Sequence, residues 1–184
     1  MKPHQSGTAR GTSYKPDNPL DQISQEHLRQ REVCATLDRL AGLETPDPDM
    51  AAGVLPHFDT LLARHVHDEE DDLFPLLRQS SEPGDDINDT LDRLARKHRV
   101  SLEMAVGVRD ILRVMVRDNA LPDIDGTAAL AGFAAHERRH LIVENAIVLP
   151  LARARLTAAD LVRLRTRMEH RRRSGGANKP GDAE

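Results

Sequence analysis

Two segments of equal length, FDTLLARHVHDEEDDLFP at residues 58–75 and FAAHERRHLIVENAIVLP at residues 133–150, share one frame. Each begins with Phe, has His at the eighth position and Glu at the twelfth, and ends with Pro. These positions are His65 and Glu69 in the first segment and His140 and Glu144 in the second. A spacing of four residues places two side chains on one helical face, one turn apart. An imidazole and a carboxylate arranged in this way can converge on a metal ion.

Apolar residues at helical spacing predict four long helices, each of which places a histidine near its middle. The predicted helices span residues 21–41, 49–77, 86–117 and 127–152. The two frames lie on the second and fourth helices, while the first and third carry His27 and His98. Asp21 is expected to cap the first helix. Pro56 and Pro75 each remove an internal hydrogen bond, so the second helix should start late, kink or end near them.

Four long helices joined by short loops favour an all-α fold, an antiparallel up-down-up-down four-helix bundle over residues 20–152. Aromatic residues make up only 2% of the 184 residues, so aliphatic side chains must build the core, which favours helices over strands. The net charge of −4 gives no general attraction to nucleic acid. Cys34 is the only cysteine and no apolar run is long enough to span a membrane, so we expect a cytoplasmic protein.

The two ends of the chain are expected to differ from the bundle. Residues 1–19 contain almost no apolar side chains and are expected to form a disordered arm. Thr157 and Asp160 have the spacing of a capping box, which predicts a short fifth helix ending near Arg173. The Arg-rich residues 153–184 are expected to close the bundle with this helix and a flexible tail. They could instead dock an acidic partner protein.

Six side chains form the candidate metal centre, namely His27, His65, Glu69, His98, His140 and Glu144. Four imidazoles and two carboxylates exceed the needs of one tetrahedral ion and suit two ions held close together. Each ion would take two imidazoles while the carboxylates bridge, and iron is among the first-row metals that such donors suit. In the acidic run at residues 68–72, only Glu69 has the helical phase of this centre, so its neighbours and His67 are expected to be solvated.

The order His, His-x3-Glu, His, His-x3-Glu, with a proline after each pair, resembles the hemerythrin-like (HHE cation-binding) family in its H-HxxxE-H-HxxxE subtype. The motifs that carry it are EHLR at 26–29, HVHDEE at 65–70, KHR at 97–99 and HLIVEN at 140–145. The resemblance implies a four-helix bundle around a non-haem di-iron centre with an oxo or hydroxo bridge. It also implies that His27 and His65 hold one iron, His98 and His140 hold the other, and Glu69 and Glu144 bridge them.

One feature departs from the oxygen-carrying hemerythrins, which place two histidines one turn apart on the third helix. Leu94 and Leu102 stand one turn on either side of His98. Each iron would therefore keep an open coordination position. Such a position suits redox or stress chemistry with O2, peroxide or nitric oxide better than it suits reversible oxygen carriage. The alternative is a regulatory module that signals iron or oxygen through the basic C-terminal segment. Candidates for a seventh protein ligand are Glu26, His57, His136 and Tyr14, among which the sequence does not choose.

Two other metal motifs overlap the second frame. His136, Glu137 and His140 match the zinc-protease pattern HExxH, in which Glu137 would be the general base. The extended pattern needs Gly and His where this chain has Val143 and Ala146, and the first frame has no equivalent of His136. Glu137 and His140 also match the Glu-x2-His of ferritin-like sites, which need a second copy that this chain lacks. Both interpretations are less favoured than a site built from the repeated frames.

Overall fold

The computed structural model describes residues 17–82 and 84–176, and every regular element within these ranges is a helix. The all-helical prediction is confirmed for this part of the chain. The predicted disordered arm falls mostly on residues 1–16 and the flexible tail on residues 177–184, both outside the described residues. None of the described helices is long and apolar enough to cross a membrane.

The first helix, α1 (Pro19–Ala41), begins two residues before the prediction. Its cap is Asn18, whose side-chain oxygen accepts a hydrogen bond of 2.9 Å from the backbone N–H of Leu20. Asp21, the predicted cap, lies inside the first turn instead, where its negative charge favours the helix N-terminus. The helix therefore starts within the stretch that was predicted to be disordered.

The second predicted helix is one rod, in which regular helix alternates with wider π-helical turns. Its elements are α2 (Pro48–Pro56), η1 (His57–Leu61), α3 (Leu62–His67), η2 (Asp68–Leu73) and α4 (Phe74–Gln79). The rod passes through both prolines without ending. Pro75 has no N–H, and its ring would clash with the carbonyl four residues earlier, so the turn before it widens. Glu69 lies in this widened turn.

The fourth predicted helix repeats this construction. The rod consists of α6 (Ile124–Val143), η3 (Glu144–Val148) and α7 (Leu149–Arg155). Pro150 follows η3 as Pro75 follows η2, and Glu144 begins the widened turn. The third helix, α5 (Ile87–Asp118), has no such interruption. Glu69 and Glu144 therefore both lie in π-helical turns, which are frequent at functional sites.

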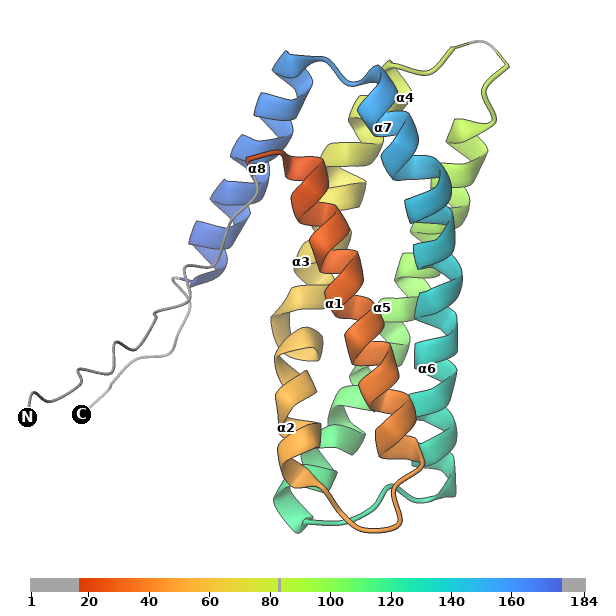
Figure 1. Ribbon diagram of the computed structural model, residues 1–184, viewed down its shortest axis with the longest axis vertical. Coiled ribbons are helices and arrows are strands. Elements are labelled where there is room, and N and C mark those ends of the chain that lie inside the picture. Colours follow the sequence, from red (N-terminus) through yellow and green to blue (C-terminus); the bar gives the residue numbers. More distant parts are fainter. Residues whose placement is uncertain (1–16, 83, 177–184) are drawn as a thin grey trace, which may run out of the picture.

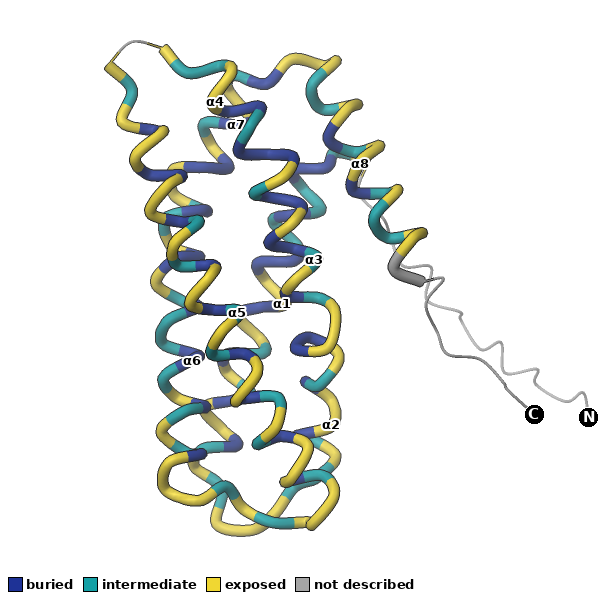
Figure 2. Tube along the Cα trace, turned by 180° about the vertical axis from the view of Figure 1, so that it is seen from behind, coloured by how far each residue is buried: buried dark blue, intermediate teal, exposed yellow. Residues whose placement is uncertain are grey.

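These rods lie side by side, with α1 against α6, α2 against α5 and α5 against α6 (Figure 1). Their buried residues face inward and form two apolar clusters (Figure 2). One cluster includes Leu20, Leu91 and Leu149, and the other includes Leu37 and Phe133. In sequence, His27, His98 and His140 fall between residues of the two clusters, and on the second rod Glu69 does so. The apolar clusters therefore flank the candidate site at both ends.

The fifth helix, α8 (Ala158–Gly176), folds back from α7 and contacts α1 and η2 (Figure 1). The predicted capping box forms, because Asp160 accepts a hydrogen bond from the Thr157 backbone N–H and donates its own N–H to the Thr157 hydroxyl. Leu164 and Met168 are fully buried in the first apolar cluster. The helix therefore packs along one side of the bundle.

Candidate metal centre

The six residues singled out by the sequence come together in the middle of the helices, and each is at most 3% exposed. Their nitrogen and oxygen atoms form two groups in which all ligand atoms lie within 4.8 Å of one another. The first group consists of His27, His65, Glu69 and Glu144, and the second of His98, His140 and Glu144. Glu144 belongs to both groups, so this geometry can hold two metal ions that share a carboxylate.

The two carboxylates contact histidines from both groups. Glu69 lies 3.3 Å from His27 Nε2 and 3.4 Å from His98 Nε2. Glu144 lies 3.5 Å from His27 Nε2 and 2.9 Å from His98 Nε2. The η2 and η3 turns thus bring one carboxylate from each frame between the lone histidines of α1 and α5.

Three of the four histidines are oriented through their second ring nitrogen. Glu26 accepts a hydrogen bond from His65 Nδ1 at 3.2 Å, and Glu70 accepts one from His98 Nδ1 at 2.8 Å. Asn145 Oδ1 accepts one from His27 Nδ1 at 3.2 Å. These bonds select the tautomer that leaves Nε2 free to face the centre, which is the usual arrangement around metal-ligating histidines.

The orienting residues follow the internal repeat. Glu70 comes directly after Glu69, and Asn145 comes directly after Glu144. Each holds the lone histidine of the other half, since Glu70 bonds to His98 on α5 and the second frame's Asn145 bonds to the α1 histidine. Neither Glu70 nor Asn145 was among the predicted site residues, although their matching places in the two frames were a usable signal.

Buried charges shift the pKa values of the imidazoles in opposite directions. Burial lowers the pKa of His98, but hydrogen bonds to Glu144 and Glu70 outweigh it and raise the pKa to about 10. Burial likewise lowers the pKa of His65, and the carboxylates of Glu69 and Glu26 raise it to about 9. For His140 burial dominates and the pKa falls to about 4. The carboxylates therefore stabilise positive charge at the centre, whether it belongs to protons or to metal ions.

Several buried polar atoms of the centre have no hydrogen-bond partner among the described residues. These atoms are His65 Nε2, His140 Nδ1, Glu69 Oε2 and Glu144 Oε2. Burying such groups without a partner is costly, and a bound metal would satisfy the imidazole Nε2 and carboxylate oxygens. The donor set of imidazoles and carboxylates fits iron and related first-row metals.

Three of the candidates for a seventh ligand, Glu26, His57 and His136, lie outside the two groups. Glu26 hydrogen bonds to His65 and to Arg172, so it orients a ligand. His136 Nε2 donates to the backbone carbonyl of Lys97 at 3.0 Å, which removes it from the zinc-protease arrangement. Tyr14 lies outside the described residues.

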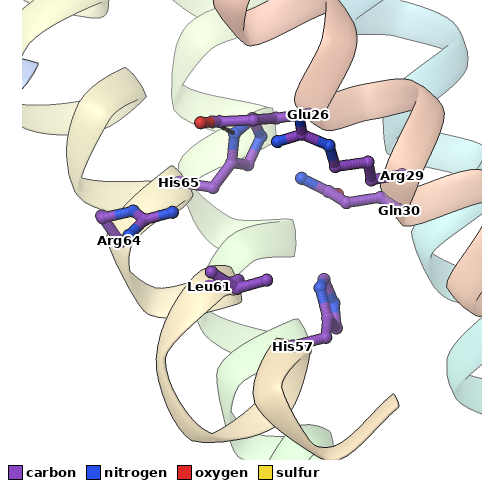
Figure 3. A pocket seen from close by; sticks show the side chains of 7 residues that line it. All are labelled: Glu26, Arg29, Gln30, His57, Leu61, Arg64 and His65. Carbon is purple, nitrogen blue, oxygen red and sulfur yellow. Dashed lines mark hydrogen bonds and ion pairs between the residues drawn. The ribbon is translucent and has the colours of Figure 1, made fainter. Parts of the chain in front are cut away.

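His57 is buried rather than on the surface, and it lines a cavity of about 30 Å³ beside His65 (Figure 3). Glu26, Arg29 and Gln30 of α1 form one wall of this cavity, and Leu61 and Arg64 lie on the opposite rod. The pKa of His57 is lowered to about 4, first by burial and then by repulsion from His65. Neutral His57 and the two arginines therefore line a small opening that leads to a centre residue.

The expectation that the neighbours of Glu69 form a solvated face is wrong for two of them. Asp68 is fully buried and Asp72 is 3% exposed. Asp68 accepts hydrogen bonds from Arg171 and Arg172 of α8. Arg167 donates to Asp72 at 3.1 Å. The basic helix α8 therefore pairs with acids of its own chain. His67 is exposed, as predicted.

Comparison with known protein families gives an independent result. The model described as the hemerythrin HHE cation binding domain matches residues 18–152. This range includes all six residues of the two candidate metal groups and ends before α8. No match was found among curated proteins.

Proposed function

The chain belongs to the hemerythrin HHE cation-binding family, and on this premise we propose that it is a non-haem di-iron protein of the H-HxxxE-H-HxxxE subtype. Its centre would bind O2, peroxide or nitric oxide in redox or stress chemistry. The antiparallel up-down-up-down order of the four rods and a cytoplasmic location belong to the same proposal. One observation supports two metals above all: Glu144 is common to two groups of ligand atoms that otherwise share no residue.

Each residue has a defined role in this proposal. His27 and His65 would hold one iron, and His98 and His140 would hold the other. Glu69 and Glu144 would bridge them, which agrees with their contacts to histidines of both groups. Glu26, Glu70 and Asn145 orient the imidazoles and increase their basicity through hydrogen bonds to Nδ1.

The surroundings suit a small ligand. When bound, the irons supply electron transfer and a place for a diatomic molecule or peroxide. The protein supplies apolar walls, since Leu94 is buried beside His98 and Phe74 stacks on the His98 ring with centroids 5.9 Å apart. The cavity beside His65 offers a route for a small molecule. Water is otherwise excluded from the six side chains by their burial.

Metal analysis together with an absorption spectrum tests the proposal. We expect two irons per chain in protein purified from iron-supplemented cells, with oxo-to-iron charge-transfer bands that change when azide is added. A chain that contains only zinc, or that cannot be loaded with any metal, would rule out the di-iron function.

A second candidate function is an iron- or oxygen-responsive regulatory module. It is favoured by a chain of contacts from α8 to the centre: Arg172 donates to Glu26 at 2.7 Å, and Glu26 accepts from His65. Movement of His65 on metal binding would therefore change how α8 packs against the bundle.

Hydrogen exchange of α8 distinguishes this function from the first. We expect slower exchange of residues 158–174 in iron-loaded than in metal-depleted protein, and a much smaller difference in the Arg172→Met variant. Arg165→Met is a suitable control, because Arg165 donates to the backbone carbonyl of Asp17 at the surface, away from the centre. Identical exchange in loaded and depleted wild-type protein would count against the regulatory function.

A further inference from the structure

Glu137 is a buried acid for which neither the orienting contacts nor the bridging roles account. Its side chain is about 1% exposed, and neither carboxylate oxygen has a hydrogen-bond partner among the described residues. One oxygen, Oε2, lies 3.5 Å from Nε2 of His140. The Ser101 side chain lies near this carboxyl group, but its hydroxyl has no hydrogen-bond partner of acceptable geometry among the described residues. A carboxyl group held in this way is costly unless a ligand completes its environment.

The internal repeat shows that Glu137 breaks the symmetry of the site. It is the fifth residue of its frame, and the fifth residue of the other frame is Leu62. Leu62 is also buried, at 2% exposure, but it offers no ligand atom. The two halves of the centre therefore differ by one carboxylate, which lies on the side of His140.

The half that contains Glu137 is the half with fewer donors. The first group of ligand atoms has four members, whereas the group of His98, His140 and Glu144 has three, and Glu137 lies outside this group but in contact with its His140. The helix of His98 offers no further imidazole or carboxylate one turn away, since Leu94 and Leu102 stand there. Glu137 comes three residues before His140 on α6, a spacing that places both side chains on one helical face. In some helical bundles this Glu-x2-His spacing supplies ligands to carboxylate-rich metal sites.

We propose that Glu137 is an additional ligand to the metal held by His98 and His140, and that it makes the two metals chemically unequal. The proposal rests on the two-metal centre proposed above. A carboxylate oxygen is a harder donor than an imidazole and carries a negative charge. The metal on this side is therefore held by more oxygen, and its higher oxidation state is stabilised relative to that of its neighbour.

The test uses Glu137→Leu, which copies Leu62 into the second half, and Glu137→Gln, which keeps the size of the side chain. Metal-depleted full-length protein is titrated with ferrous iron alone, without oxygen. Wild-type protein should bind two irons. In Glu137→Leu one iron should bind as in the wild type and the other at least about tenfold more weakly, by comparison with the loss of residues that orient ligands. Glu137→Gln should lie between them, because the amide oxygen is neutral.

Mössbauer spectra provide a readout that does not depend on activity. The wild type should show two distinct iron environments, and Glu137→Leu loaded at low iron should keep only the one assigned to the His27 and His65 side. Glu103→Gln is the matched control, because Glu103 is exposed on α5 and should leave both environments unchanged.

Stability of the metal-depleted protein separates a ligand from a structural acid. Glu137→Leu removes a buried carboxyl group without partners, so the Tm of the depleted protein should rise by about 2–4 °C while iron binding weakens. A lower Tm with unchanged iron affinity would assign Glu137 a structural role and overturn the proposal. So would two irons bound with wild-type affinity and spectra in both variants. Fewer than two irons in the wild type would instead contradict the di-iron function itself.

Discussion

Replacing Glu144 with alanine is expected to abolish both metal sites of the proposed di-iron centre, because this carboxylate belongs to both groups of ligand atoms. Its oxygens lie 3.5 Å from His27 Nε2 and 2.9 Å from His98 Nε2. Loss of a bridging ligand would weaken the binding of both ions at once. We expect the affinity to fall by more than the roughly 10- to 100-fold typical of residues that only orient a ligand.

Metal content and the absorption spectrum of Glu144→Ala measure this effect. The variant should contain far less than one iron per chain after gel filtration, and the charge-transfer bands should be absent. Glu32→Ala is the control, since Glu32 follows His27 on α1 but is exposed and should keep the wild-type iron content. A Glu144→Ala protein that retains both irons would show that Glu144 does not bridge them.

A one-sided variant sharpens the same prediction. His140 belongs only to the second group, so His140→Ala should weaken the binding of one metal and leave the binding of the other unchanged. The contrast between His140→Ala and Glu144→Ala therefore measures how far the two metals depend on the shared carboxylate. Equal losses in both variants would indicate that the metals bind only as a pair.

The repeated frame, together with the lone histidines of the first and third predicted helices, was sufficient to predict which six side chains lie together, because helical periodicity decides which side chains share a face. It placed His65 with Glu69, and His140 with Glu144, on rods whose extents agree with the structure to within a few residues. Helix ends were less predictable. Asn18 rather than Asp21 caps α1, and both can serve as caps, so the choice depends on where the preceding chain turns.

The residues around the centre could not be assigned in the same way, because their partners lie on other helices. Asp68 and Asp72 lie three and seven residues after His65, near its helical face, and their burial depends on the arginines of α8 that pair with them. The same limit applies to Glu70, whose contact with His98 depends on how α5 packs against the second rod. The sequence drew attention to Glu137 through the HExxH motif, but only the structure shows that its carboxyl group is buried without a hydrogen-bond partner among the described residues.

The Arg171→Met/Arg172→Met double variant is expected to lose about 3–5 kcal/mol of unfolding free energy, the usual cost of leaving a buried charge without its partners. Asp68 is fully buried and accepts hydrogen bonds from both arginines, including one of 2.7 Å from Arg172. Methionine keeps the apolar length of the side chain, so Asp68 stays covered while its positive partners are removed.

Urea unfolding of metal-depleted protein isolates this effect from metal binding. Arg163→Met should change the free energy of unfolding by no more than about 0.5 kcal/mol. Arg163 is 52% exposed, and its ion pair with Asp160 is a long one of 3.8 Å. Adding Asp68→Asn to the double variant should recover part of the loss, since a neutral amide is cheaper to bury than a carboxylate. Deleting residues 157–184 should expose Asp68 to water and therefore remove this penalty, while losing the packing of Leu164 and Met168. If the double variant is as stable as the wild type, the arginines of α8 are not the partners that allow Asp68 to be buried beside the metal centre.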